Sequence, residues 1–173
     1  MANSLADPAH GAAYRTGAAV LFAAVIVILA ALAFEYIGGY VPCPLCLQQR
    51  YAYYAGVPLL FLALVLVAAE QRRPAALVLL VVALGFLANA GLGIYHAGAE
   101  WKFWPGPDTC AAAAGPLTTN AGGLLQELSK TRVVRCDEAA WRMLGLSFAG
   151  WNVVACLLLA AGAASAAVKA WRR

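Results

Sequence analysis

The sequence predicts an all-α membrane protein, a bundle of four transmembrane helices. Of its 173 residues, 64% are hydrophobic and 12% are charged, whereas soluble domains have roughly 45–50% apolar and about 25% charged residues. The mean hydropathy is +0.76. Four apolar runs are long enough to cross a hydrocarbon core of about 30 Å, which takes roughly 20 helical residues. This length leaves room for modest loops, so we expect a single integral membrane domain over residues 1–173.

The four predicted spans are rich in alanine, leucine and valine and are apolar on all sides. They cover approximately residues 17–37, 52–69, 75–94 and 148–168. Such runs indicate burial in lipid or in a helical bundle rather than a half-exposed helix of a soluble protein. The first run has full spanning length, and no short apolar region with an obvious cleavage site precedes it. We therefore expect a retained first helix and not a removed signal peptide.

The short basic turn at residues 70–74 sets the predicted orientation. Because it joins the second and third spans directly, these spans are antiparallel neighbours, and both termini lie on the side of the turn. Each side carries six basic residues, but those beside the turn and termini are concentrated next to the helix ends, where the positive-inside bias acts. Four of the other six are spread through a long loop. We expect cytoplasmic termini and two loops on the opposite face, at about 38–51 and 97–147.

The long second loop carries aromatic residues at both ends and turn signals between them. Tryptophan and phenylalanine side chains near the membrane surface are typical anchors at the headgroup level, and we assign that role to Trp101, Phe103, Trp104, Trp141 and Trp151. Residues 124–134 could form a short helix that lies on the surface. The net charge of +4 is small, and the basic residues form no stripe, so nucleic acid is not an expected partner.

Four of the five cysteines fall in the two loops of the same non-cytoplasmic face. They are Cys43, Cys46, Cys110 and Cys136, while Cys156 lies in the last span and is interpreted as a small packing residue. If that face is a periplasm, disulfides are expected there. Four cysteines allow three pairings, and a CxxC motif beside a distant pair favours Cys43–Cys46 with Cys110–Cys136.

The two pairs differ in what a disulfide would contribute. The distant pair would close a loop of about 26 residues and constrain the unfolded chain by about 3.5 kcal/mol, so a purely structural disulfide is reasonable there. A disulfide within the motif CPLC at residues 43–46 would stabilise the fold far less and would close a strained ring, which favours a redox role. A four-cysteine zinc site is the other alternative. We expect no metal, because the second pair is not CxxC and an oxidising compartment competes with thiolate ligation.

Basic and ionisable residues near the CxxC motif indicate where its electrons go. Cys46 lies just before the second span with Arg50 one turn further on, and both the helix N-terminus and the guanidinium favour a thiolate. The chain has no dinucleotide fingerprint, haem motif or metal-ligand run, so a mobile lipid-soluble quinone is the natural acceptor. Arg50 could donate to a quinone oxygen or simply snorkel. His96 could also donate to a quinone oxygen, or it and Glu35 could be ordinary interface residues.

These residues resemble a known family. The sequence CPLCLQQR at residues 43–50 is similar to the CxxCxxxR signature of the disulfide bond formation protein B family, DsbB. The sequence WPGPDTC at 104–110 and the stretch from CDEAAW at 136–141 to Trp151 also resemble that family, so the likeness covers nearly the whole chain. It implies a thiol:quinone oxidoreductase of the bacterial inner membrane. Such an enzyme reoxidises a periplasmic thioredoxin-fold oxidant, DsbA-like, and passes electrons to ubiquinone or menaquinone.

The resemblance also implies individual roles. Cys110 would form the mixed disulfide with the partner, Cys136 would exchange with Cys43, and Cys46 would face the quinone as a thiolate. The candidate catalytic residues are therefore Cys43, Cys46, Cys110 and Cys136, and the candidate quinone-binding residues are Arg50 and His96, which falls near a family histidine placed by the quinone. Two alternatives remain: a vitamin K epoxide reductase-like enzyme, in which the CxxC belongs to a late span, and a non-enzymatic membrane protein whose thiols bind metal.

Overall fold

The computed structural model describes residues 8–107 and 136–172. Four helices make up most of these residues: α1 (Pro8–Tyr36), α2 (Pro44–Ala68), α3 (Arg72–Glu100) and α5 (Phe148–Trp171). A short hairpin of β1 (Arg142–Met143) and β2 (Leu146–Ser147) precedes α5. Within the described residues, four helices are long and apolar enough to cross a membrane. The predicted four-helix membrane fold is confirmed.

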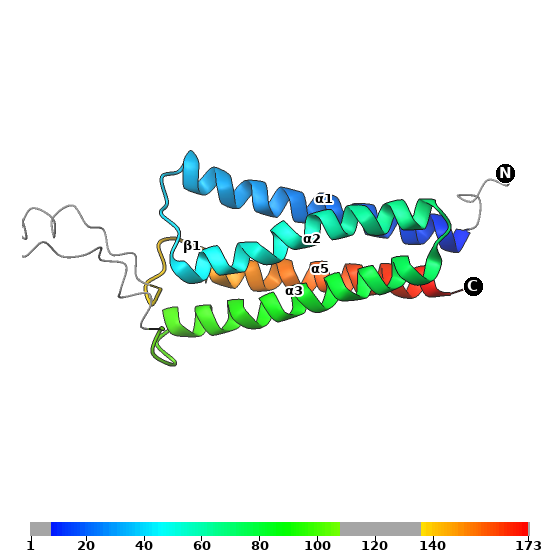
Figure 1. The fold of residues 1–173 in the computed structure, drawn as a ribbon. Helices are drawn as coiled ribbons and strands as arrows, with labels where there is room; N and C mark the ends of the chain where they lie inside the picture. Colours follow the sequence, from blue (N-terminus) through cyan, green and yellow to red (C-terminus); the bar gives the residue numbers. More distant parts are fainter. Residues whose placement is uncertain (1–7, 108–135, 173) are drawn as a thin grey trace, which may run out of the picture.

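The four helices run side by side in an up-and-down bundle (Figure 1). Helix α5 packs against α1 and α3, and α2 packs against the same two helices. The start of α1, the end of α5 and the α2–α3 turn lie at one end of the bundle. The α1–α2 connection and the hairpin lie at the other end. The CxxC motif and Cys136 therefore belong to the same end, which we call the loop end.

The helices are longer than the apolar pattern predicts, and the difference matters most for α2. This helix begins at Pro44 and not near residue 52, because Cys43 is its N-cap and proline suits the first helical position. The polar residues 48–50 interrupt the apolar run but not the helix. Helix α3 likewise continues to Glu100, so His96 is helical. The CxxC motif thus forms the first turn of a helix, while the predicted surface helix at 124–134 lies outside the described residues.

The β1–β2 hairpin is an element that the sequence analysis did not predict. Its two-residue turn has φ angles of +53° at Leu144 and +83° at Gly145, as a type I′ hairpin turn requires. Ser147 ends the hairpin and caps α5, because its Oγ accepts a hydrogen bond from the Gly150 N–H at 3.2 Å. The hairpin therefore fixes where α5 starts at the loop end.

The interior of the bundle is built largely from small residues, which let membrane helices approach closely. Alanine provides most of the fully buried positions along the shared axis: Ala13, Ala24, Ala63, Ala75, Ala163 and Ala166. Gly93 of α3 lies close against α5 near the loop end, since a Cβ atom there would lie 2.8 Å from Cγ2 of Val153. This contact brings the polar side chains of α3 and α5 together.

Replacing this glycine tests the packing. Gly93→Ala is expected to destabilise the bundle by about 1–3 kcal/mol, because the new Cβ atom would lie 2.8 Å from Cγ2 of Val153, a side chain that is stiff at χ1. Gly91→Ala is the matched control, since a Cβ atom there meets nothing within 4 Å. Thermal unfolding in detergent should separate the two variants. Equal midpoints would mean that the α3–α5 contact is looser than the structure indicates.

Candidate functional site

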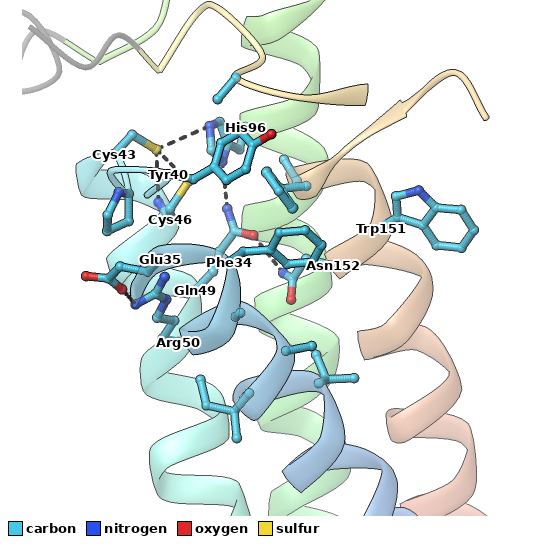
Figure 2. Close-up of a pocket in the computed structure, with 18 of the residues that line it drawn as sticks. Phe34, Glu35, Tyr40, Cys43, Cys46, Gln49, Arg50, His96, Trp151 and Asn152 are labelled. Atoms are coloured by element: carbon cyan, nitrogen blue, oxygen red, sulfur yellow. Dashed lines mark hydrogen bonds and ion pairs between the residues drawn. The ribbon is translucent and has the colours of Figure 1, made fainter. Parts of the chain in front are cut away.

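A cavity of about 370 Å³ opens at the loop end between the helices (Figure 2). It is lined from α1, α2, α3 and α5 and from the segments 40–43 and 138–140. Four of the six predicted site residues line it: Cys43, Cys46, Arg50 and His96. The fifth, Cys136, packs beside Cys43, and Cys110 lies outside the described residues. The structure thus gathers residues from separate segments around one cavity.

The two cysteines of the CxxC motif are in the dithiol form. Cys43 and Cys46 are free thiols, as is Cys156, and the Sγ atoms of Cys43 and Cys46 are 2.8 Å apart. The disulfide favoured for this pair is therefore not formed in the structure, although the sulfurs are close together. Cys136 is disulfide-bonded. Its predicted pairing with Cys110 stays a prediction, because Cys110 is not among the described residues.

Of the two sulfurs in the CxxC motif, the sulfur of Cys43 is better placed to carry a negative charge. It accepts a hydrogen bond from the Cys46 N–H at 3.2 Å and lies 3.6 Å from Nε2 of His96. The hydrogen bond with the Cys46 thiol, which is the largest cause, and the nearby His96 together lower the pKa of Cys43 to about 5, against the opposing effect of burial. The sequence analysis placed a thiolate at Cys46, which lies within the first turn, and that role stays a prediction. As the N-cap, Cys43 faces the free N–H groups of the same turn.

Cys136 meets the CxxC motif in a buried cluster. Cys43, Leu45 and Cys136 form this cluster, with Cys46 and Leu92 packed against it. Only 1% of Cys136 is exposed. An ion pair between Nζ of Lys102 and Oδ2 of Asp137, at 2.7 Å, ties the segment after Cys136 to the end of α3. A cysteine of the second loop is therefore held next to the first member of the CxxC pair.

Arg50 is paired with an acid across the cavity wall. Its guanidinium donates a hydrogen bond to the carboxylate of Glu35, which comes from the last turn of α1. Both side chains line the cavity and are mostly buried, with exposures of 12% for Arg50 and 22% for Glu35. Figure 2 shows this pair on the α2 side, away from His96. Because a guanidinium carries five N–H donors, the ion pair leaves Arg50 able to bind a further acceptor.

His96 is surrounded by polar side chains that the sequence analysis did not select. Its Nδ1 lies 2.8 Å from Nε2 of Gln49, and its Nε2 lies 3.8 Å from Oε1 of Glu100. Ser147 donates a hydrogen bond to Glu100, and Asn152 donates one to Oε1 of Gln49 at 2.7 Å. A polar residue inside a spanning helix is itself a functional signal. That signal was available for Gln49 and Asn152.

Aromatic rings form another wall of the cavity. Phe34 and Phe148 have ring centroids 5.0 Å apart, and Tyr40 lies 5.8 Å from Phe148. Trp141, predicted as a headgroup anchor, stacks on Phe148 at 4.9 Å, and Trp151 also lines the cavity. Trp101, Phe103 and Trp104 are exposed, as anchors would be. The cavity walls therefore suit a flat, largely apolar ring.

The cavity extends along α1 toward the lipid-facing surface. Its apolar end is lined by Ile26, Val27, Ala30 and Ala31. Half of the surface of Ile26 is exposed. A ligand with a polar head and a long hydrocarbon tail could therefore place its head near the thiols and its tail along α1.

Comparison with known proteins agrees with the motif. The profile of the family described as disulfide bond formation protein DsbB matches residues 14–166. The chain belongs to the DsbB family. It is therefore a multi-pass membrane protein of disulfide bond formation, and the DsbB resemblance is confirmed.

Individual relatives support the same DsbB assignment. The chain is 34% identical over 148 residues to disulfide bond formation protein B of Methylococcus capsulatus, covering 82% of this chain and 85% of the relative. It is 31% identical over 136 residues to the protein of that name from Marinobacter nauticus, covering 73% and 76%. An uncharacterized protein of Rickettsia prowazekii is 26% identical over 141 residues, covering 80% and 79%. No solved structure gave a significant match.

Proposed function

We propose that the chain is a thiol:quinone oxidoreductase of the bacterial inner membrane. It reoxidises a periplasmic, DsbA-like thioredoxin-fold dithiol and passes the electrons through two cysteine pairs to ubiquinone or menaquinone. The observation that carries this proposal is the placement of Cys136 in one buried cluster with Cys43, at the edge of a cavity that holds Cys46 and Arg50. A relay needs sulfurs from both pairs within reach of each other and one of them beside the acceptor.

The relay balances as a series of thiol–disulfide exchanges. A partner thiolate attacks Cys110 of a Cys110–Cys136 disulfide, and Cys136 leaves as a thiolate. Cys136 then attacks Sγ of Cys43 in a Cys43–Cys46 disulfide, and Cys46 leaves as a thiolate beside the cavity. The second thiol of the partner then attacks the mixed disulfide, so the oxidised partner leaves and Cys110 is released as a thiolate. Cys110 attacks Cys136 of the Cys43–Cys136 disulfide, which re-forms Cys110–Cys136 and frees Cys43 as a thiolate. Cys43 and Cys46 finally pass two electrons, with two protons, to the quinone as their own disulfide re-forms. Overall, one dithiol and one quinone become one disulfide and one quinol.

The cavity fits a quinone head group in size and chemistry. Ligand pockets usually have volumes of about 300–1,000 Å³ and few polar groups, and this cavity has about 370 Å³. Arg50 provides donors for the carbonyl oxygens, His96 lines the cavity beside the thiols, and the aromatic wall faces the ring. The apolar path along α1 accommodates an isoprenoid tail.

Purified protein with quinone and a reduced thioredoxin-fold partner tests this function. One quinol is expected for each disulfide formed in the partner. Consumption of partner thiols without quinol formation would contradict the assignment of quinone as the electron acceptor. Zinc binding without turnover would favour the metal-binding alternative. The proposed orientation is tested separately by a topology reporter fused after Arg173, which should report the cytoplasm.

The proposed quinone contact of Arg50 gives a kinetic prediction. Arg50→Ala is expected to raise the KM for quinone about tenfold or more, since a hydrogen bond from a charged donor contributes roughly 1.5–3 kcal/mol. Glu35→Gln is the matched control, because it removes the charge partner of Arg50 and keeps the guanidinium. Its KM should change less. An unchanged KM in Arg50→Ala would leave Arg50 as a structural ion-pair partner only.

A further inference from the structure

Gln49 lies at the centre of a buried hydrogen-bond chain beside the thiols. Only 5% of its surface is exposed. Its Nε2 is 2.8 Å from Nδ1 of His96, and its Oε1 accepts a hydrogen bond from Nδ2 of Asn152 at 2.7 Å (Figure 2). Asn152 is held in turn by Tyr53, whose hydroxyl donates to Oδ1 of Asn152 at 2.8 Å. Residues of α2, α3 and α5 are thereby joined in one chain.

The donors and acceptors along this hydrogen-bond chain have a fixed order, and that order determines which ring nitrogen of His96 carries the proton. A side-chain amide nitrogen can only donate, so Nδ1 of His96 must accept from Gln49 and carries no proton. Rotating the Gln49 amide by itself would point its N–H groups at the N–H groups of Asn152. A neutral imidazole has one N–H. That N–H is therefore at Nε2, the nitrogen that lies 3.6 Å from Sγ of Cys43 and 3.8 Å from Oε1 of Glu100.

We propose that Gln49 is a positioning residue that holds His96 as the Nε2–H tautomer. In this form His96 donates toward the sulfur of Cys43 and supports it as a thiolate. The value of that support for catalysis rests on the proposed relay, whereas the tautomer is a property of the resting protein.

The same tautomer disfavours the binding of a metal ion by Cys43, Cys46 and His96. The ligand atoms of Cys43, Cys46 and His96 all lie within 4.8 Å of one another, and two thiolates with an imidazole are a ligand set that zinc accepts. Coordination would need the lone pair of Nε2, with the proton moved to Nδ1. Metal-binding histidines usually donate that second N–H to an acceptor. Gln49 presents a donor there instead, so it protects a dithiol that is reduced in every catalytic cycle.

The tautomer can be measured directly. The chain has two histidines, His10 and His96, so protein labelled with nitrogen-15 histidine in a His10→Gln background reports His96 alone. We expect the proton on Nε2 in the otherwise unaltered protein. In Gln49→Glu, a carboxylate of nearly the same shape should accept from Nδ1–H and move the proton to that nitrogen. A proton on Nδ1 without the Gln49 substitution would overturn the proposal.

Metal titration provides the second readout. In reduced protein without quinone or partner, Gln49→Glu should bind Co²⁺ about 10–100-fold more tightly than the unaltered protein, as changes in the partners of metal-binding histidines do. The gain should vanish in Gln49→Glu with His96→Ala and after oxidation of the thiols. If Gln49→Glu fails to fold, Gln49→Met removes the donor without adding charge and should give a smaller gain. Equal Co²⁺ affinity with and without the Gln49 substitution would overturn the proposal that Gln49 disfavours metal binding. Neither the tautomer measurement nor the metal titration depends on turnover.

Discussion

Cys43→Ser is expected to lower turnover with quinone and a reduced thioredoxin-fold partner by about a thousandfold or more, as loss of a covalent nucleophile does. Without the sulfur at position 43, Cys46 has no partner for a disulfide and Cys136 has no sulfur to attack. The fold should survive, because Cys43 is the N-cap of α2 and serine is among the best N-cap residues. The loss is then chemical and not structural.

The other buried free thiol provides the control for this substitution. Cys156 contacts the Tyr53 hydroxyl at 3.3 Å and accepts from Nδ2 of Asn89 at 3.1 Å, contacts that a serine hydroxyl can also make. Cys156→Ser should therefore stay close to the unaltered protein in turnover and in thermal stability. If both serine variants lost activity alike, or if Cys43→Ser kept its activity, the proposed route through Cys43 would be wrong.

The bundle was predictable from the sequence because a membrane helix has to be apolar over its whole length. The composition and the four runs sufficed for the number of helices, and the basic turn at 70–74 sufficed for their antiparallel order. The helix ends were not predictable from hydropathy. The first turns of α2 carry Gln48, Gln49 and Arg50, whose side chains are polar although their backbone is helical. The capping role of Cys43 extends the helix through this polar stretch.

The site was only partly predictable, for a different reason. The CxxC motif and Arg50 stand out because they are close together in sequence, and a second cysteine pair stands out by count. The partners that define their chemistry come from other helices: Glu35 for Arg50 and Gln49 for His96. Hydropathy and local spacing do not show which polar residues of different helices face one another. For that reason the sequence analysis left Glu35 as an interface residue and passed over Gln49.

The charge on Cys43 leads to the second large expected effect. In the reduced protein, the ultraviolet absorbance of one thiolate should persist as the pH falls until about 5, where the Cys43 thiol titrates, instead of disappearing near the ordinary value of 9.0. The hydrogen bond from the Cys46 thiol is the largest cause, and His96 adds to it. Because the pKa is lowered, the stabilisation of the reduced form grows between pH 5 and 9. It is complete above that range and lost as the pH falls through 5.

This thiolate also sets how strongly the Cys43–Cys46 disulfide oxidises its partners. A stabilised reduced form raises the reduction potential, and one pKa unit is worth about 1.4 kcal/mol, or about 30 mV for two electrons. His96→Leu removes a donor from Cys43 and keeps the pair of thiols. It should move the thiolate titration to higher pH and lower the potential by about 30 mV for each unit of that move. A titration curve that stays in place in His96→Leu would show that the imidazole does not stabilise the thiolate, and the low pKa of Cys43 would then depend on Cys46 alone.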